Sequence, residues 1–181
     1  MRPPDPSARA LVALVPKQIS ATINRWRSRY DPNFRIVPPH ITVAYPPFIP
    51  PEEWEEMRPV AGRCLEMFAP FRVQLEHLGV FWGSPSHLWL APDDGGSFAR
   101  IRQALAQLLP EYMPTLPFAY VPHVTIGAFS SDCDLLAAKE AVHSAWRPRS
   151  FELTELVYMA PNRQGVWCVC TRLPLGSVDR P

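Results

Sequence analysis

Pro38-Pro39-His40-Ile41-Thr42-Val43-Ala44-Tyr45-Pro46-Pro47 is a short segment with prolines at both ends. Read with the two-residue period of a β-strand, it places His40 and Thr42 on one face and the aliphatic Ile41 and Val43 on the other. The prolines limit the length of the strand, because proline has no backbone N–H to donate to a sheet. The segment therefore predicts a strand with one apolar face and one face that presents an imidazole and a hydroxyl.

A second segment, Val121-Pro122-His123-Val124-Thr125-Ile126-Gly127-Ala128-Phe129, repeats this pattern. Aligned on the histidines, both segments read proline, histidine, aliphatic, threonine, aliphatic, small residue. They lie a little under half of the 181-residue chain apart, a spacing that favours two related half-domains over the shorter period of a solenoid. Packing alone gives no reason for both polar residues to recur, so the repeat favours a functional site over ordinary strand positions.

Hydrophobic periodicity and turn residues predict further elements around the two motif strands. We expect one domain over residues 1–181, with an antiparallel sheet backed by helices, and one motif strand, in each half of the sequence. Ser97 is expected to be the N-cap of the third helix. The expected strands cover residues 8–15, 71–75, 87–91, 151–158 and 166–173, and the expected helices cover residues 16–30, 50–68, 98–109 and 131–146.

The composition is that of a globular protein and argues against several function classes. A hydrophobic content of 47% argues against disorder. The formal net charge of +1 argues against a non-specific nucleic-acid binder. The N-terminus has no apolar signal core, and no apolar run is long enough to cross a membrane. We therefore expect a cytoplasmic monomer that makes no membrane contact.

The cysteines and the remaining histidines carry no pattern that is typical of a site. The cysteines lack the spacing of zinc ligands, and we expect reduced thiols buried in the core. The histidines outside the motifs are expected to be structural or surface residues. The residues concerned are Cys64, Cys133, Cys168 and Cys170, and His77, His87 and His143.

Two histidines that face one another across a cleft can carry out acid–base chemistry at phosphorus. Their ordinary pKa of about 6.5 lets one imidazole be neutral while the other is protonated. One ring can then take a proton from the attacking oxygen, and the other can protonate the leaving oxygen. Thr42 and Thr125 lie two residues on, about 7 Å along each strand, where their hydroxyls can donate to phosphoryl oxygens. Ala44 and Gly127 are expected to leave room for the substrate, and no metal or other cofactor is required.

The paired motifs His40-Ile41-Thr42-Val43 and His123-Val124-Thr125-Ile126 resemble the signature of the 2H phosphoesterase superfamily. This superfamily includes bacterial 2'-5' RNA ligase-like proteins and RNA 2',3'-cyclic phosphodiesterases. The resemblance implies an α+β fold of two pseudo-symmetric lobes with the active-site cleft between them. It implies metal-independent opening of a 2',3'-cyclic phosphodiester, or cleavage of a 2'-5' linkage, in a nucleotide or at an RNA terminus. It leaves open which histidine is the acid and whether a ligase direction exists. The implied catalytic set is His40, Thr42, His123 and Thr125.

The chain departs from several RNA-acting relatives, which carry an arginine shortly after a motif. Here Ala44-Tyr45-Pro46 and Gly127-Ala128-Phe129 follow the motifs, which favours a small cyclic nucleotide or ADP-ribose cyclic phosphate over long RNA. Six aromatic residues could stack on a substrate base, and most of them are expected in the core. Tyr45 and Phe129 are the preferred candidates, and the others are Phe48, Trp82, Tyr120 and Trp167. A non-catalytic module that binds nucleotides or RNA ends is the alternative function. A Cys/His hydrolase that uses Cys133 is a third hypothesis.

Overall fold

The computed structural model describes residues 8–176, which form eight strands and four α-helices. The strands are β1 (Ala10–Leu14), β2 (His40–Ala44), β3 (Phe71–Phe81), β4 (Ser86–Asp93), β5 (Val124–Phe129), β6 (Arg149–Leu153), β7 (Glu155–Pro161) and β8 (Trp167–Pro174). The helices are α1 (Lys17–Tyr30), α2 (Trp54–Leu65), α3 (Ser97–Leu108) and α4 (Asp132–Ala145), and Pro110–Tyr112 forms a short 3₁₀-helix.

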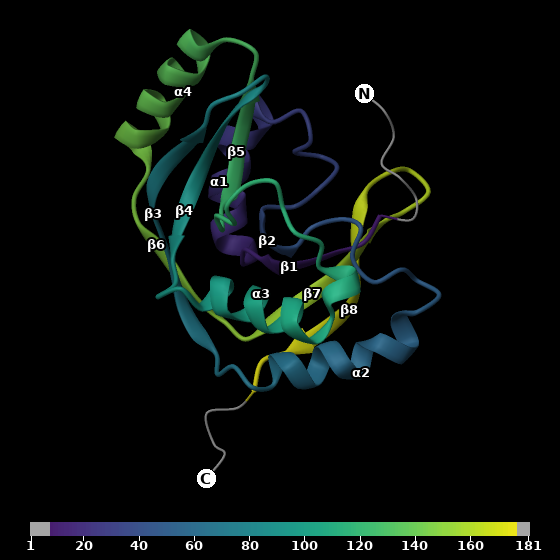
Figure 1. Ribbon diagram of the computed structural model, residues 1–181. Helices are drawn as coiled ribbons and strands as arrows, with labels where there is room; N and C mark the ends of the chain where they lie inside the picture. The colour runs from purple at the N-terminus through teal and green to yellow at the C-terminus, as the bar shows by residue number, and fades with distance from the viewer. Residues whose placement is uncertain (1–7, 177–181) are drawn as a thin grey trace.

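The strands form two antiparallel sheets of four strands each, which confirms the α+β class with two helix-backed sheets (Figure 1). The first sheet has the order β2-β1-β7-β8 and the second has the order β5-β4-β3-β6. The prediction that each half of the sequence supplies one sheet is wrong, because β7 and β8 return to the N-terminal strands. Residues 151–158, expected as one strand, are β6 and β7 in different sheets, and the chain passes between the sheets at Thr154.

The two motif strands, β2 and β5, are the outer strands of their sheets and lie in contact with one another. Each strand has a β-bulge directly after its motif threonine. In β2 the register moves from Val12 opposite Thr42 to Leu11 opposite Ala44, so that Val43 is the extra residue. In β5 the neighbouring strand pairs with Thr125 and then with Gly127, which leaves Ile126 as the extra residue. The repeat in the sequence is therefore also a repeat in backbone geometry.

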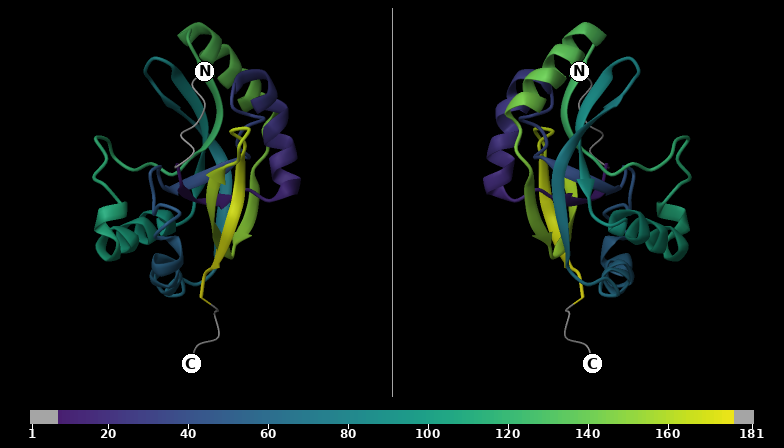
Figure 2. Two further views of the ribbon diagram at one scale, coloured as in Figure 1. Left: turned by 90° about the vertical axis from the view of Figure 1, so that its right-hand side faces the viewer. Right: turned by 90° about the vertical axis from the view of Figure 1, so that its left-hand side faces the viewer.

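The helix that connects the strands of one sheet packs on the other sheet. Helix α1 leaves β1 of the first sheet, packs on β5 of the second, and returns to β2. Helix α3 leaves β4 of the second sheet, packs on β2 of the first, and returns to β5. Helix α4 packs on β4 and β5, and α2 packs on β8 and α3, so each sheet is covered on its outer side (Figure 2). Each motif strand is thus backed by a helix that begins in the other lobe.

The small residue after each motif serves packing and does not make room for a substrate, contrary to our expectation. Gly127 lies directly under Tyr30, the last residue of α1. A Cβ at position 127 would lie 2.5 Å from Tyr30 Cβ and 2.9 Å from the Tyr30 carbonyl oxygen, so only glycine permits this approach. Ala44 is fully buried in the core. The bulges turn both residues away from the polar face of their strands.

Two further expectations about single residues are wrong. Gly96 rather than Ser97 is the N-cap residue of α3, and Asp94 Oδ2 accepts a hydrogen bond of 2.6 Å from the Phe98 N–H in its first turn. Of the cysteines, Cys64 is buried as expected, whereas three are exposed, two of them on the outer strand β8. The exposed cysteines are Cys133, Cys168 and Cys170.

No helix within residues 8–176 has the length and apolar character to cross a bilayer.

Candidate active site

Both motif histidines make the same local hydrogen bond. His40 Nδ1 lies 2.7 Å from the Pro38 carbonyl oxygen, and His123 Nδ1 lies 2.8 Å from the Val121 carbonyl oxygen. A carbonyl oxygen can only accept, so Nδ1 carries the proton and the neutral ring keeps its lone pair on Nε2. Each imidazole is therefore fixed in orientation with Nε2 as the nitrogen that remains available for chemistry.

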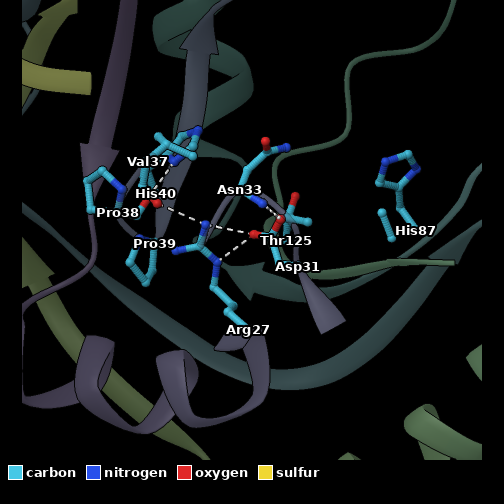
Figure 3. A pocket seen from close by; sticks show the side chains of 10 residues that line it. Arg27, Asp31, Asn33, Val37, Pro38, Pro39, His40, His87 and Thr125 are labelled. Atoms are coloured by element: carbon cyan, nitrogen blue, oxygen red, sulfur yellow. Dashed lines mark hydrogen bonds and ion pairs between the residues drawn. The ribbon is translucent and has the colours of Figure 1, made fainter. Parts of the chain in front are cut away.

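Two cavities share His40 as a lining residue, and the first of them has lining residues from both sheets. The first, of about 220 Å³, is lined by His40 from β2 and Thr125 from β5 (Figure 3). The second, of about 200 Å³, is lined by His40 and Thr42. His123 lines neither cavity, but its charge would lower the pKa of His40, which places the two imidazoles within electrostatic reach. The structure thus gathers all four motif residues at the adjoining edges of the two sheets.

Burial dominates the acid–base character of both imidazoles. It lowers the pKa of His40 from 6.5 to about 4, although the hydrogen bond to the Pro38 carbonyl acts in the opposite direction. Burial also lowers the pKa of His123, against the opposing effect of its bond to Val121. Both rings are therefore neutral at neutral pH in the free protein. Within residues 8–176 no group of three or more His, Cys, Asp or Glu side chains is placed to hold a metal ion.

His123 is supported from behind by two aromatic rings of the second sheet. Phe81 and the imidazole are nearly perpendicular at a centroid distance of 4.9 Å, and Trp89 lies at 5.9 Å. Trp89 also stacks on Phe81 at 4.7 Å. The indole covers Gly79 on the neighbouring strand, where a Cβ would lie 2.2 Å from the Trp89 ring. The bare backbone of Gly79 therefore allows Trp89 to lie flat and to hold His123.

We predict that His123 is a catalytic group, and that Gly79→Ala lowers the turnover number kcat about 10²-fold by misplacing it, because displacements near 1 Å have effects of this size. The new methyl group must push the Trp89 ring, which in turn contacts the imidazole. Steady-state kinetics of the wild type and of Gly79→Ala measures the change in kcat, and thermal unfolding of both shows whether the fold is kept. The control is Gly62→Ala, at a helical glycine with no heavy atom within 4 Å of the added carbon. An equal loss of kcat in both variants would contradict the role of Gly79.

Arg27 lies at the base of the first cavity, but its charge is already paired. The guanidinium Nη2 lies 2.7 Å from Asp31 Oδ2, and Nε donates to the same oxygen at 2.9 Å. Nη2 also donates to the Val37 carbonyl at 2.9 Å, three residues before His40, as the dashed lines in Figure 3 show. Arg27 therefore fixes the segment that leads into β2. It does not replace the arginine that is missing after the motifs.

Two side chains, one from α3 and one from the segment before β5, donate hydrogen bonds to backbone carbonyls at the bulge of β2. Arg102 Nη1 donates to the Val43 carbonyl at 2.6 Å, and the Tyr120 hydroxyl donates to the Thr42 carbonyl at 2.9 Å. These bonds occupy the backbone acceptors at the bulge, where regular sheet pairing is interrupted. Both bonds hold the backbone beside Thr42 in place.

The structure does not bring the two predicted base-stacking residues to the histidines. Tyr45 follows the bulge, with Arg102 over its ring at 5.7 Å and Phe118 nearly perpendicular to it at a centroid distance of 6.2 Å. Phe129 is buried and packs on Tyr30 at 5.5 Å. Neither residue lines either of the two cavities that contain His40.

His87 and Trp89 lie at the candidate site, although the sequence did not single them out for it. His87 was expected to be structural or on the surface, yet it lines the first cavity together with His40 and Thr125 (Figure 3). It lies opposite Ala128 of β5. The alternation His87-Leu88-Trp89 already placed both residues on one strand face, but the sequence did not show which strand β4 would join. His77 and His143 are exposed, as expected. Cys133 is exposed and lines neither cavity.

Comparison with known proteins gives consistent matches over most of the chain. The sequence model of the 2'-5' RNA ligase superfamily matches residues 15–165. Proteins named as candidate phosphoesterases match from Geobacillus kaustophilus, at 28% identity over 93% of this chain and 96% of that protein, and from Halalkalibacterium halodurans, at 30% identity over 93% and 98%.

Solved structures match in fold. TT0787 of Thermus thermophilus superposes with a TM-score of 0.66 at 19% identity, covering 94% of this chain and 99% of that chain. LigT of E. coli complexed with 3'-AMP also has a TM-score of 0.66, at 18% identity over 94% and 99%. At these identities the structural matches show a shared fold and no more.

Proposed function

This chain belongs to the 2'-5' RNA ligase superfamily of 2H phosphoesterases, and we propose that it is a metal-independent phosphodiesterase that acts on nucleotides or RNA ends. The bond broken would be that of a 2',3'-cyclic phosphate or of a 2'-5' linkage. The observation that carries the proposal is that His40 of one sheet and Thr125 of the other line a single cavity, with Thr42 in the adjoining one. The names of the relatives support a phosphoesterase.

The proposed reaction needs only the four motif residues. With the phosphorus between Thr42 and Thr125, both hydroxyls donate to its non-bridging oxygens and stabilise the charge of the transition state. One imidazole Nε2 takes a proton from water as the water oxygen bonds to phosphorus. The bond from phosphorus to a ribose oxygen breaks, and that oxygen receives a proton from Nε2 of the second, protonated imidazole. The product is a phosphomonoester, and one proton has been exchanged at each ring.

Two observations favour a small nucleotide as the substrate. The cavities of about 220 Å³ and about 200 Å³ are small, and both contain His40. In addition, the structure of E. coli LigT, which shares this fold, is described as a complex with 3'-AMP. A mononucleotide cyclic phosphate would place its phosphorus at the junction of the two cavities.

The test is turnover of 2',3'-cyclic AMP and of a 2'-5'-linked adenylate dinucleotide in the presence of excess EDTA, followed by chromatography of the products. We expect a phosphomonoester from at least one substrate. Saturable binding of 2',3'-cyclic AMP without any turnover would instead identify a non-catalytic binding module. Loss of activity on addition of EDTA would identify a metal-dependent enzyme.

The lowered pKa values predict an acidic optimum for kcat/KM. In the free enzyme one ring must be neutral and the other protonated, and both pKa values lie below 6.5, with that of His40 at about 4. The active combination is therefore most abundant on the acid side of pH 6.5, and above that pH kcat/KM falls about tenfold for each pH unit. A bound anionic phosphodiester raises both pKa values, so the profile of kcat extends to higher pH.

The measurement is a pH series of initial rates for 2',3'-cyclic AMP. Circular dichroism at each pH is the necessary control. Histidines with lowered pKa values take up protons on unfolding, so the folded state loses stability as the pH falls from 6.5 towards 4. A value of kcat/KM that stays level from about pH 5 to about pH 8 would be incompatible with this acid–base pair.

A further inference from the structure

The second cavity differs in chemistry from the first. Its lining is apolar except for the two motif residues, and its largest side chain is an indole. The first cavity has polar side chains from Arg27, Asp31, Asn33 and His87. The two cavities share His40, so a substrate with its phosphorus there has a polar part of the site on one side and an apolar part on the other. The second cavity is lined by Ala10, Val12, Val37, His40, Thr42, Pro46, Met159 and Trp167.

Trp167 is held so that its indole forms a fixed wall of this cavity. The half-buried indole packs on a small apolar cluster that is separate from the main core. The Trp167 backbone N–H donates to the Ile36 carbonyl at 2.8 Å, which joins the start of β8 to the segment that leads into His40. An aromatic ring fixed in this way loses little freedom when a flat partner lies against it. The supporting cluster is Ala10, Val12, Val157 and Met159.

We propose that the cavity beside Trp167 is a nucleobase subsite, in which the base of the substrate stacks on the indole. The inference rests on the proposed function for its reaction, and it adds that recognition includes the base and not the ribose cyclic phosphate alone. Stacking on an aromatic side chain tolerates every base, because each base has a π-face. His40 and Thr42, which the proposed reaction uses, are the polar residues of the lining, and the cavity has no charged carboxylate, guanidinium, amine or amide side chain to read the edge of a base. We therefore expect both purine and pyrimidine nucleotides to be accepted.

The experiment compares Trp167→Ala with Trp167→Phe on three substrates. These are 2',3'-cyclic AMP, 2',3'-cyclic UMP and methyl riboside 2',3'-cyclic phosphate, which has no base. Trp167→Ala should raise KM for the two nucleotides about 5- to 150-fold and leave KM for the base-free substrate unchanged. Trp167→Phe should restore most of the affinity. The matched control is Trp82→Ala, because Trp82 is 61% exposed and lies between β3 and β4, outside both cavities.

Equal increases in KM for nucleotide and base-free substrates in Trp167→Ala would overturn the subsite, as would no increase for either. Calorimetric titration with 3'-AMP and with ribose 5-phosphate separates this inference from the proposed function. If the protein turns over none of the substrates, but Trp167→Ala and not Trp82→Ala weakens the binding of 3'-AMP, the subsite stands and the phosphodiesterase proposal fails. If turnover occurs and Trp167→Ala changes neither KM nor the binding of 3'-AMP, the phosphodiesterase proposal stands and the base subsite fails.

Discussion

His40→Ala and His123→Ala should each lower kcat for 2',3'-cyclic AMP by about 10²- to 10⁴-fold, the range expected when one partner of an acid–base pair is removed. Either variant keeps one imidazole, but a single ring cannot both take the proton of water and protonate the ribose oxygen in one step. The double variant is expected to be little worse than either single variant, because the two rings act as a unit. Initial rates with product chromatography provide the measurement.

The control for these variants is His77→Ala, since His77 is an exposed histidine of β3 that lines neither cavity. It should leave kcat within experimental error of the wild type. Thermal unfolding of all variants separates loss of chemistry from loss of fold. Unchanged activity in either motif variant would rule out the two-histidine reaction, whatever the other variant does.

Arg27→Leu should lower the free energy of unfolding by about 3–5 kcal/mol, the range found when one partner of a buried ion pair is removed. The side chains of Arg27 and Asp31 are 2% and 4% exposed, so the carboxylate would be left buried without its cation. The Val37 carbonyl would also lose its donor. Asp31→Asn should also lower the free energy of unfolding, because it leaves the buried Arg27 guanidinium without its carboxylate. Urea unfolding followed by circular dichroism gives the free energies.

The comparison for this prediction is Arg58→Leu, which breaks an ion pair with Glu55 on the surface of α2. These two side chains are 46% and 77% exposed, so solvent screens their attraction and the change should stay below about 1 kcal/mol. A similar loss in Arg27→Leu and Arg58→Leu would show that the buried pair has no special role. The double variant Arg27→Met with Asp31→Leu should recover much of the stability, because it leaves no unpaired charge.

The sequence was most informative where the signal was local. The period of two placed His40 and Thr42 on one face of a short strand, and the structure shows both side chains at cavities. The second motif behaves in the same way for Thr125. The roles of these residues in catalysis stay a prediction, because strand geometry alone shows only where the side chains point.

Features that depend on a partner strand could not be read from the sequence. A bulge exists only relative to the register of its neighbour, so Val43 and Ile126 looked like ordinary strand residues. The alternation over residues 151–158 continues without a turn residue, and nothing local shows that the chain changes sheets at Thr154. Phe129 looked like a residue near a site because it follows a motif, yet the contact with Tyr30 buries it.

Because α1 and α3 each connect strands of one sheet and pack on the other, the two lobes cannot unfold independently. If the first lobe opened alone, β5 would lose the helix that covers it, and if the second opened alone, β2 would lose its cover. Partial unfolding of either lobe therefore exposes apolar surface in both lobes. The free-energy cost of opening one lobe thus approaches the cost of unfolding the whole domain. The two sheets are bound into a single cooperative unit, and amide hydrogens in β2 and β5 should become exchangeable together, although they belong to different sheets.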